Sequence, residues 1–140
     1  MELSDALAFA APLRHGVLTT LKRDGRPQLS NVSYLLGDDG VIRVSITADR
    51  AKYTNLRRDP RVSLHITRDD FYAYVVFEAD AELSAVAAST DDATVDELVE
   101  LYSRLAGEHS DWDEYRRAMV ADRRLVVQIT PTRAYGMLGT

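Results

Sequence analysis

Two cations stand close together after a predicted strand, in the segment Ser45-Ile-Thr-Ala-Asp-Arg-Ala-Lys52. Arg50 and Lys52 are two positions apart, and the only other lysine of the chain is Lys22. Cations at the start of a helix, where backbone N–H groups are unpaired, suit a phosphate group. The alternative is that this segment is the solvated basic face of a helix. The sequence therefore offers a candidate anion site around Lys52.

The charge of the chain is distributed unevenly. The net charge is −5, yet residues 22–61 carry nine Lys/Arg against five Asp/Glu, a net charge of +4. Residues 69–114 carry fourteen acidic side chains and one basic residue, Arg104, a net charge of −13. Proteins that bind nucleic acid draw much of their affinity from basic charge, which this acidic chain lacks. A basic segment within an acidic protein favours a small anionic ligand.

Other catalytic patterns are absent from the sequence. There are no cysteines, which excludes disulfides, thiolate catalysis and cysteine-ligated metal. His15, His65 and His109 show no metal-ligand spacing, so no metal site is predicted. The sequence contains neither a nucleophile elbow nor a Walker loop. This pattern points to chemistry supplied by a cofactor, or to no chemistry at all.

Length and composition predict a single domain over residues 1–140, large enough to bury a core. No apolar run approaches the ~18 residues of a membrane span. The N-terminal segment Met1-Glu-Leu-Ser-Asp5 is acidic and lacks the basic start of a signal peptide. We therefore expect a cytoplasmic protein.

Turn signals and alternating polar and apolar residues predict a series of strands. Asp24-Gly25 and Asp39-Gly40 mark two tight turns, and Pro60 ends a short helix predicted at residues 51–58. Residues 71–79 and 81–83 are interpreted as a further pair of strands. The remaining strands are predicted at residues 15–22, 28–36, 41–46, 61–67, 124–129 and 133–137.

Helical spacing of apolar residues indicates three more helices. A short N-terminal helix is expected to be capped by Ser4, and a longer one over residues 91–106 stops at Gly107. Ser110 with Asp113 is predicted to open another helix. Together these elements predict an α+β fold, a small antiparallel β-barrel with flanking helices. The last helix carries one stripe of Trp112, Tyr115 and Met119.

Several segments together resemble a known family. The likeness begins with Gly16-Val-Leu-Thr-Thr-Leu-Lys-Arg-Asp-Gly-Arg-Pro-Gln-Leu-Ser-Asn31 and continues in Val44-Ser-Ile and Arg50-Ala-Lys-Tyr-Thr-Asn-Leu-Arg-Arg-Asp-Pro60. Gly107-Glu-His-Ser-Asp-Trp-Asp-Glu-Tyr-Arg116 and Ala118-Met-Val-Ala-Asp-Arg-Arg124 extend it over nearly the whole chain. These segments resemble the pyridoxamine 5′-phosphate oxidase-like superfamily, whose fold is an FMN-binding-like split β-barrel. The likeness is greatest to its actinobacterial branch, which binds the deazaflavin coenzyme F420.

The resemblance implies a cofactor groove at a homodimer interface. Arg50 and Lys52 would hold the cofactor phosphate, and Tyr72 and Tyr74 would face the groove from the partner subunit. Relatives in this branch carry a Trp at the position of Tyr72, a difference that concerns the shape of the substrate pocket. The implied cofactor-binding set is Pro27, Gln28, Leu29, Ser30, Asn31, Ser45, Ile46, Arg50, Lys52, Asn55, Tyr72 and Tyr74.

The activity implied by the resemblance is that of a coenzyme F420H2-dependent reductase. Such an enzyme passes a hydride from the deazaflavin to a conjugated double bond, in a quinone, an enone or a tetrapyrrole. No residue of the sequence stands out as the proton donor. One alternative is an FMN-dependent pyridoxamine phosphate oxidase, although the Arg-Leu-x-Pro-type ending of those oxidases is missing here. The other alternative is a non-catalytic F420 carrier, which would bind the cofactor without turnover.

Overall fold

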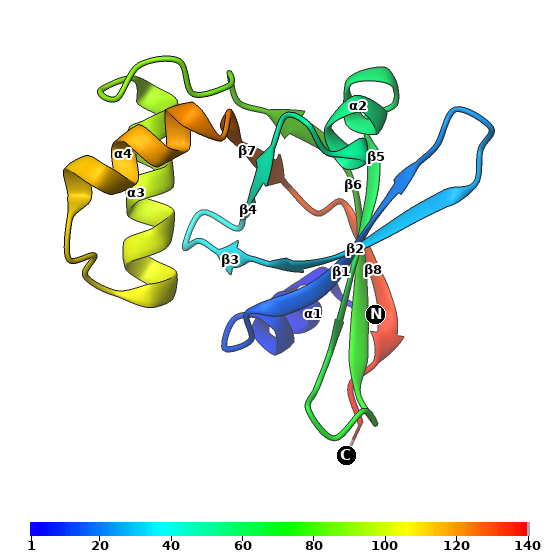
Figure 1. Ribbon diagram of the computed structural model, residues 1–140. Coiled ribbons are helices and arrows are strands. Elements are labelled where there is room, and N and C mark those ends of the chain that lie inside the picture. Colours follow the sequence, from blue (N-terminus) through cyan, green and yellow to red (C-terminus); the bar gives the residue numbers. More distant parts are fainter. Residues whose placement is uncertain (140) are drawn as a thin grey trace.

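The computed structural model describes residues 1–139 and shows a curled antiparallel sheet flanked by helices (Figure 1). The strand order is β2-β1-β5-β6-β7-β4-β3, and β8 pairs with β6 outside this path. This architecture confirms the predicted α+β split-barrel class. The strands are β1 (His15–Leu21), β2 (Pro27–Ser33), β3 (Leu35–Leu36), β4 (Ile42–Thr47), β5 (Arg61–Thr67), β6 (Tyr74–Leu83), β7 (Arg124–Ile129) and β8 (Arg133–Met137).

The strand predicted at residues 28–36 is interrupted at Tyr34. The Tyr34 backbone N–H donates to Arg14 O at 2.8 Å, one step beyond the last pair of the β1–β2 ladder, His15 with Ser33. Its side chain is fully buried, and its hydroxyl donates to Ala10 O at 2.7 Å. Tyr34 thus ties the N-terminal helix to the sheet, and the chain turns there from β2 into the short strand β3.

The pair of strands predicted at residues 71–83 is wrong, because one strand, β6, runs from Tyr74 to Leu83. Its first part, as far as Asp80, pairs with β5, and the residues from Ala81 onward pair with β7. A single long strand can therefore belong to both parts of the curled sheet. The sequence pattern breaks at the exposed Asp80, where the partner strand changes.

The helices are α1 (Leu3–Ala10), α2 (Ala51–Arg58), α3 (Ala93–Ala106) and α4 (Trp112–Ala121). Two predicted caps are wrong. Ser4 lies inside α1, whose N-cap position is Glu2, and α4 is capped by Asp111, whose carboxylate accepts from the Glu114 N–H at 3.1 Å. Asp111 stands one residue nearer the first turn than Ser110, so its carboxylate reaches the unpaired N–H groups. Among the described helices, none has the length and apolar composition of a membrane span.

Strand β7 is buried on both faces. Leu125, Val127 and Ile129 belong to the main core inside the curled sheet. Val126 belongs to a second core, in which it packs with Leu98 of α3 and other side chains of the helical pair. Burying one such side chain contributes about 1.5–3 kcal/mol, so both cores hold β7 in place. The helices α3 and α4 consequently stand beside β7 and β4 (Figure 1).

Candidate functional site

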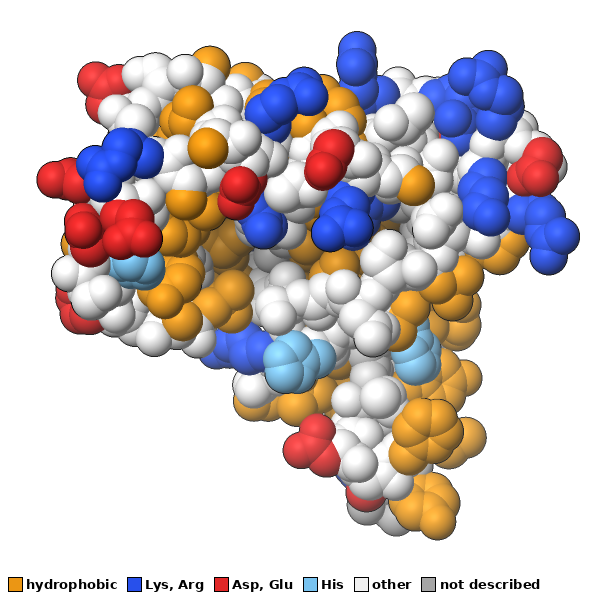
Figure 2. All heavy atoms as spheres, in the orientation of Figure 1, with side chains coloured by type: hydrophobic (Ala, Val, Ile, Leu, Met, Phe, Trp, Pro, Cys, Tyr) orange, Lys and Arg blue, Asp and Glu red, His pale blue; other side chains and the backbone are white. Residues whose placement is uncertain are grey.

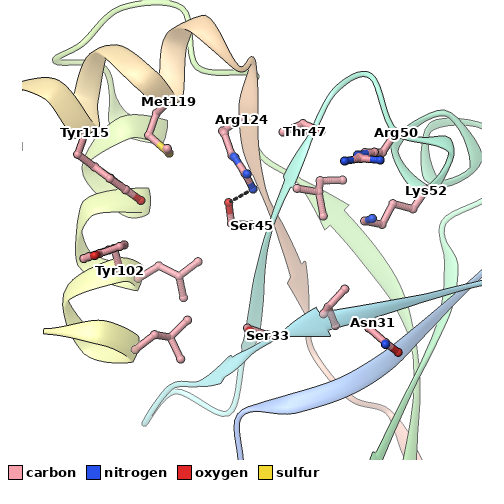
Figure 3. A pocket seen from close by; sticks show the side chains of 14 residues that line it. Asn31, Ser33, Ser45, Thr47, Arg50, Lys52, Tyr102, Tyr115, Met119 and Arg124 are labelled. Carbon is pink, nitrogen blue, oxygen red and sulfur yellow. Dashed lines mark hydrogen bonds between the residues drawn. The ribbon is translucent and has the colours of Figure 1, made fainter. Parts of the chain in front are cut away.

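A cavity of about 700 Å³ lies between the sheet and the helical pair α3–α4 (Figure 3). One side is formed by the ends of β2 and β4 and by the start of α2, and the other by α3 and α4. Its lining consists of Asn31, Val32, Ser33, Ser45, Ile46, Thr47, Arg50, Lys52, Leu101, Tyr102, Leu105, Tyr115, Met119 and Arg124.

Three cations line this cavity from two separate elements. Arg50 is the N-cap residue of α2, Lys52 is in its first turn, and Arg124 opens β7. None of the ion pairs formed within the described residues involves these three side chains, whereas Arg43, for example, is paired with Asp39. The cavity therefore collects positive charge without a carboxylate to balance it. Such a site favours an anionic ligand.

The pKa of Lys52 reflects this unbalanced charge. Burial lowers it below the ordinary value, and the positive charges of Arg50 and Arg124 lower it further. Each of these causes disfavours the ammonium form, and an anion bound beside Lys52 would oppose them. Keeping Lys52 charged in this cavity therefore costs free energy, and a phosphate group bound beside it would reduce this cost.

Arg124 adds a second sign of an anion site. Its Nη1 donates to Ser45 Oγ at 3.3 Å (Figure 3). Its Nε is buried and has no hydrogen-bond partner among the described residues. A buried donor without a partner costs about 1–3 kcal/mol. A phosphate oxygen at this position would accept the unused Nε–H, so the residues present fit a cofactor that carries a phosphate.

The wall opposite the cations is apolar and aromatic. Tyr102 and Leu105 of α3 and Tyr115 and Met119 of α4 face the cavity (Figure 3). The Tyr115 hydroxyl donates to Leu98 O at 3.0 Å, and burial raises the pKa of this phenol. The rings of Tyr102, His109, Trp112 and Tyr115 contact one another with centroids 5.0–5.8 Å apart.

Polar contacts hold the helical wall against the sheet. Glu97 of α3 accepts from Arg43 Nε of β4 at 3.2 Å and from Gln128 Nε2 of β7 at 2.9 Å. The two sides of the cavity also differ in charge: Figure 2 shows acidic side chains over the helical pair and basic ones over α2 and the β1–β2 hairpin. An occupant of the cavity would meet cations on one side and an apolar surface on the other. This combination suits a phosphate-bearing molecule with a flat or hydrophobic part.

Part of the cofactor-binding set predicted from the sequence comes together at this cavity, namely Asn31, Ser45, Ile46, Arg50 and Lys52. Four neighbours on β2 lie outside its lining, nearer the hairpin tip, and among them Leu29 is 60% exposed. These four are Pro27, Gln28, Leu29 and Ser30.

Asn55, Tyr72 and Tyr74 also lie outside this lining. Asn55 is buried under α2, where its Nδ2 donates to Thr20 Oγ1 at 3.1 Å and its Oδ1 accepts from Arg58. It fastens α2 to β1. Tyr72 is 78% exposed in the loop before β6, and the Tyr74 ring packs on His65 with centroids 5.4 Å apart. Within one chain the two tyrosines are therefore on a different face from Lys52.

Sequence reasoning missed Arg124 and the helical wall. Arg124 reaches the site because β7 pairs with β4, which sets Thr47 opposite Arg124 and Ser45 opposite Val126. No local pattern encodes a pairing between segments so far apart. A signal did exist for the wall, since Tyr115 and Met119 were predicted to share one helix face. Only the packing of that face shows that it borders the cations.

The fold and this cavity define a flavin-binding split barrel of the pyridoxamine 5′-phosphate oxidase type. The chain belongs to the pyridoxamine 5′-phosphate oxidase family, whose profile matches residues 5–138. A conserved hypothetical protein from Mycobacterium tuberculosis is 28% identical, with a TM-score of 0.75 over 99% of this chain and 85% of that one.

Two further solved structures extend the comparison. An F420 reductase is 25% identical, with a TM-score of 0.70 over 91% of this chain and 94% of its own. The heme storage protein from Vibrio cholerae is 16% identical, with a TM-score of 0.70 over 98% and 96% of the two chains. At that low identity the last likeness concerns the fold alone. The family is therefore established, and the particular cofactor is a separate question.

Proposed function

We propose that the protein is a coenzyme F420H2-dependent reductase. The observation that carries the proposal is the cluster of Arg50, Lys52 and Arg124, three cations that form no ion pair within residues 1–139, with one donor, Arg124 Nε, buried and unsatisfied there. The similarity to an F420 reductase over 91% of the chain supports the choice of cofactor. F420 carries a phosphodiester for this cluster, and the carboxylates of its polyglutamate tail add negative charge that suits the basic segment of residues 22–61.

When bound, the deazaflavin would supply the hydride for a conjugated double bond. The residues of this chain would bind and orient it. Arg50, Lys52 and Arg124 would hold the phosphate, and Ser45 would keep the Arg124 guanidinium in position. The wall that contains Tyr102 and Met119 would exclude water from that side. Fixing both reactants in one geometry is the main contribution that such a protein makes.

The proposed enzyme is a homodimer, and an apolar sheet face supports this. Leu29, Tyr135 and Met137 are 60%, 51% and 59% exposed on the outer strands β2 and β8. Phe71 and Tyr72, at 80% and 78% exposure, extend this face at the loop before β6. Figure 2 shows hydrophobic side chains gathered toward the lower end of the molecule, where that loop lies in Figure 1. A second copy covering this face would bring its own Tyr72 and Tyr74 near the groove. Sedimentation of the purified protein as a monomer at micromolar concentration would contradict the dimer.

The test of the cofactor is a parallel equilibrium titration of the purified protein with F420 and FMN, followed by fluorescence. We expect a clear preference for F420, and oxidation of F420H2 when quinones and enones are offered. The family match favours FMN as the second candidate, and a preference for FMN would support an oxidase instead. Tight F420 binding without reduction across the panel would indicate a carrier. Binding of neither cofactor would refute the proposal.

A further inference from the structure

A second cavity, of about 630 Å³, adjoins the first along the C-terminal half of β2. Asn31, Val32 and Ser33 line both cavities, so this part of β2 is a wall that they share. A molecule anchored by its phosphate at Lys52 and extending past Asn31 would reach the boundary between them. The second cavity is therefore placed to hold a reaction partner of that molecule.

Two histidines line the second cavity. The pairing register sets Val17 of β1 opposite both Asn31 of β2 and His65 of β5, so the three form one row across the sheet. Side chains two residues apart on a strand share a face, which places His15 on the same face as Val17. His15 and His65 both belong to the lining, and they are the only imidazoles in the described lining of either cavity.

An aromatic side chain stands at the edge of the same cavity. Phe71 has a backbone φ of 71°, in the left-handed region that residues other than glycine seldom adopt. Its backbone N–H donates to Arg68 O at 2.8 Å, and Asp70 Oδ1 accepts from the Tyr72 N–H at 3.0 Å, so the turn is held by its own hydrogen bonds. Strained residues that persist in this way concentrate at functional sites. Here the strained turn presents a large apolar ring to the cavity, on the same sheet face that a second copy would cover in the proposed homodimer, since the row continues from His65 through Val76 to Tyr135.

We propose that the second cavity is the substrate subsite for a small conjugated carbonyl compound and that His65 is its proton donor. This inference rests on the proposed function. When bound, the reduced deazaflavin would supply the hydride: its own C–H bond would break, a C–H bond would form at the β-carbon of the substrate, and the electron pair of the C=C π bond would move toward the carbonyl. His65 then gives a proton to the α-carbon and regains one from solvent. The substrate is reduced by two electrons and the deazaflavin is oxidised by two.

Burial favours His65 over His15, because His65 is half-buried in this cavity whereas His15 is exposed. The titratable and charged groups that face it are His15 from β1, Tyr74 from β6, and Arg68 and Asp69 from the loop after β5. The Arg68 charge is paired with Asp70, with Nη2 and Oδ2 at 2.8 Å. Imidazole is the side chain best able to exchange protons near neutral pH.

The Tyr115 phenol of the first cavity fits this role poorly. The Tyr115 hydroxyl already donates to Leu98 O, and its pKa is raised by burial, so it is both engaged and a weaker acid. His65, in contrast, is half-buried and packs on Tyr74 with ring centroids 5.4 Å apart. An imidazole restricted in this way, one strand away from Asn31 of the shared wall, can meet a substrate in a defined orientation.

The first test compares His65→Gln with the wild type in the steady-state reduction of 2-cyclohexen-1-one by F420H2. We expect kcat to fall by about a hundredfold, the usual contribution of a general acid, while the affinity for F420 is unchanged. His109→Gln is the control for removal of an imidazole outside both linings, and its F420 affinity is measured alongside because His109 packs on Tyr102 and Tyr115 of the first cavity. Turnover of His65→Gln at the wild-type rate would overturn the inference. Failure of the wild-type protein to bind F420 would instead refute the proposed function.

The second test needs no turnover. The chain has three histidines, so the imidazole C–H resonances can be assigned by single substitutions. We expect 2-cyclohexen-1-one, added to the protein with oxidised F420, to shift the resonances of His15 and His65 and to leave those of His109 unchanged. Absence of a shift at both His15 and His65 would overturn the subsite, and this readout is made on the wild-type protein, whatever the activity of the substituted proteins.

Discussion

Removal of the Lys52 ammonium is the most direct test of the anion site. A charge-assisted hydrogen bond to a phosphate contributes about 1.5–3 kcal/mol, so Lys52→Ala is expected to weaken F420 binding by roughly tenfold to a hundredfold. The structure also predicts the effect on the free protein. Because burial and the charges of Arg50 and Arg124 lower the pKa of Lys52, its ammonium form is disfavoured in the absence of a ligand. Its removal should therefore leave the free energy of unfolding unchanged or raise it.

The assay is a fluorescence titration with F420 beside a thermal unfolding curve for each variant. Lys22→Ala is the matched control, since Lys22 is the only other lysine and is exposed at the β1–β2 hairpin. An ion pair with an exposed charge contributes about 0–1 kcal/mol, so Lys22→Ala is expected to change F420 affinity by less than about tenfold. Equal losses of affinity in the two variants would show that long-range charge alone attracts the cofactor. An unchanged affinity in Lys52→Ala would refute the site.

Three more predictions follow from the same geometry. Because the bound phosphate favours the Lys52 ammonium, F420 affinity should fall as pH rises toward the ordinary lysine pKa of 10.5. In titrations across the same pH range, the F420 affinity of Lys52→Ala should not show the part of this fall that comes from deprotonation of Lys52. Arg124→Gln should weaken F420 binding by about tenfold or more in the same titration, whereas Arg117→Gln, exposed on α4, should not. Tyr34→Phe should lower the free energy of unfolding by about 0.5–1.5 kcal/mol in denaturant titrations, because the buried Ala10 carbonyl loses one of its two donors and keeps the Leu13 N–H.

Local features of the fold were predictable because they depend on neighbours in sequence. The strand at Arg61–Thr67 and the helix at Ala51–Arg58 match their predicted bounds, since turn residues and Pro60 mark their ends. Features that depend on distant partners were not predictable. The break of β2 at Tyr34 follows from a hydrogen bond to α1, and the continuity of β6 follows from pairing with two different strands.

The predicted cofactor-binding residues also fall into two groups, those placed by local sequence spacing and those placed by tertiary packing. Arg50 and Lys52 were found because they stand together at the start of one helix, where sequence spacing alone sets their proximity. Asn55, in the same motif, is buried and bonded to Thr20, a partner that only the packing of α2 on β1 reveals. Its place in the motif therefore does not distinguish a cofactor contact from a structural one.

The sequence by itself determined the class of this protein: an α+β split barrel with a basic segment at the start of α2 and an acidic helical pair near its C-terminal end. Tertiary structure alone decided the composition of the site. Pairing of β4 with β7 brings Arg124 to Ser45 across 79 residues. Pairing of β1 with both β2 and β5 brings Asn31 and His65 to opposite sides of Val17. Such registers depend on the burial of whole strands in a common core, which no short stretch of sequence encodes.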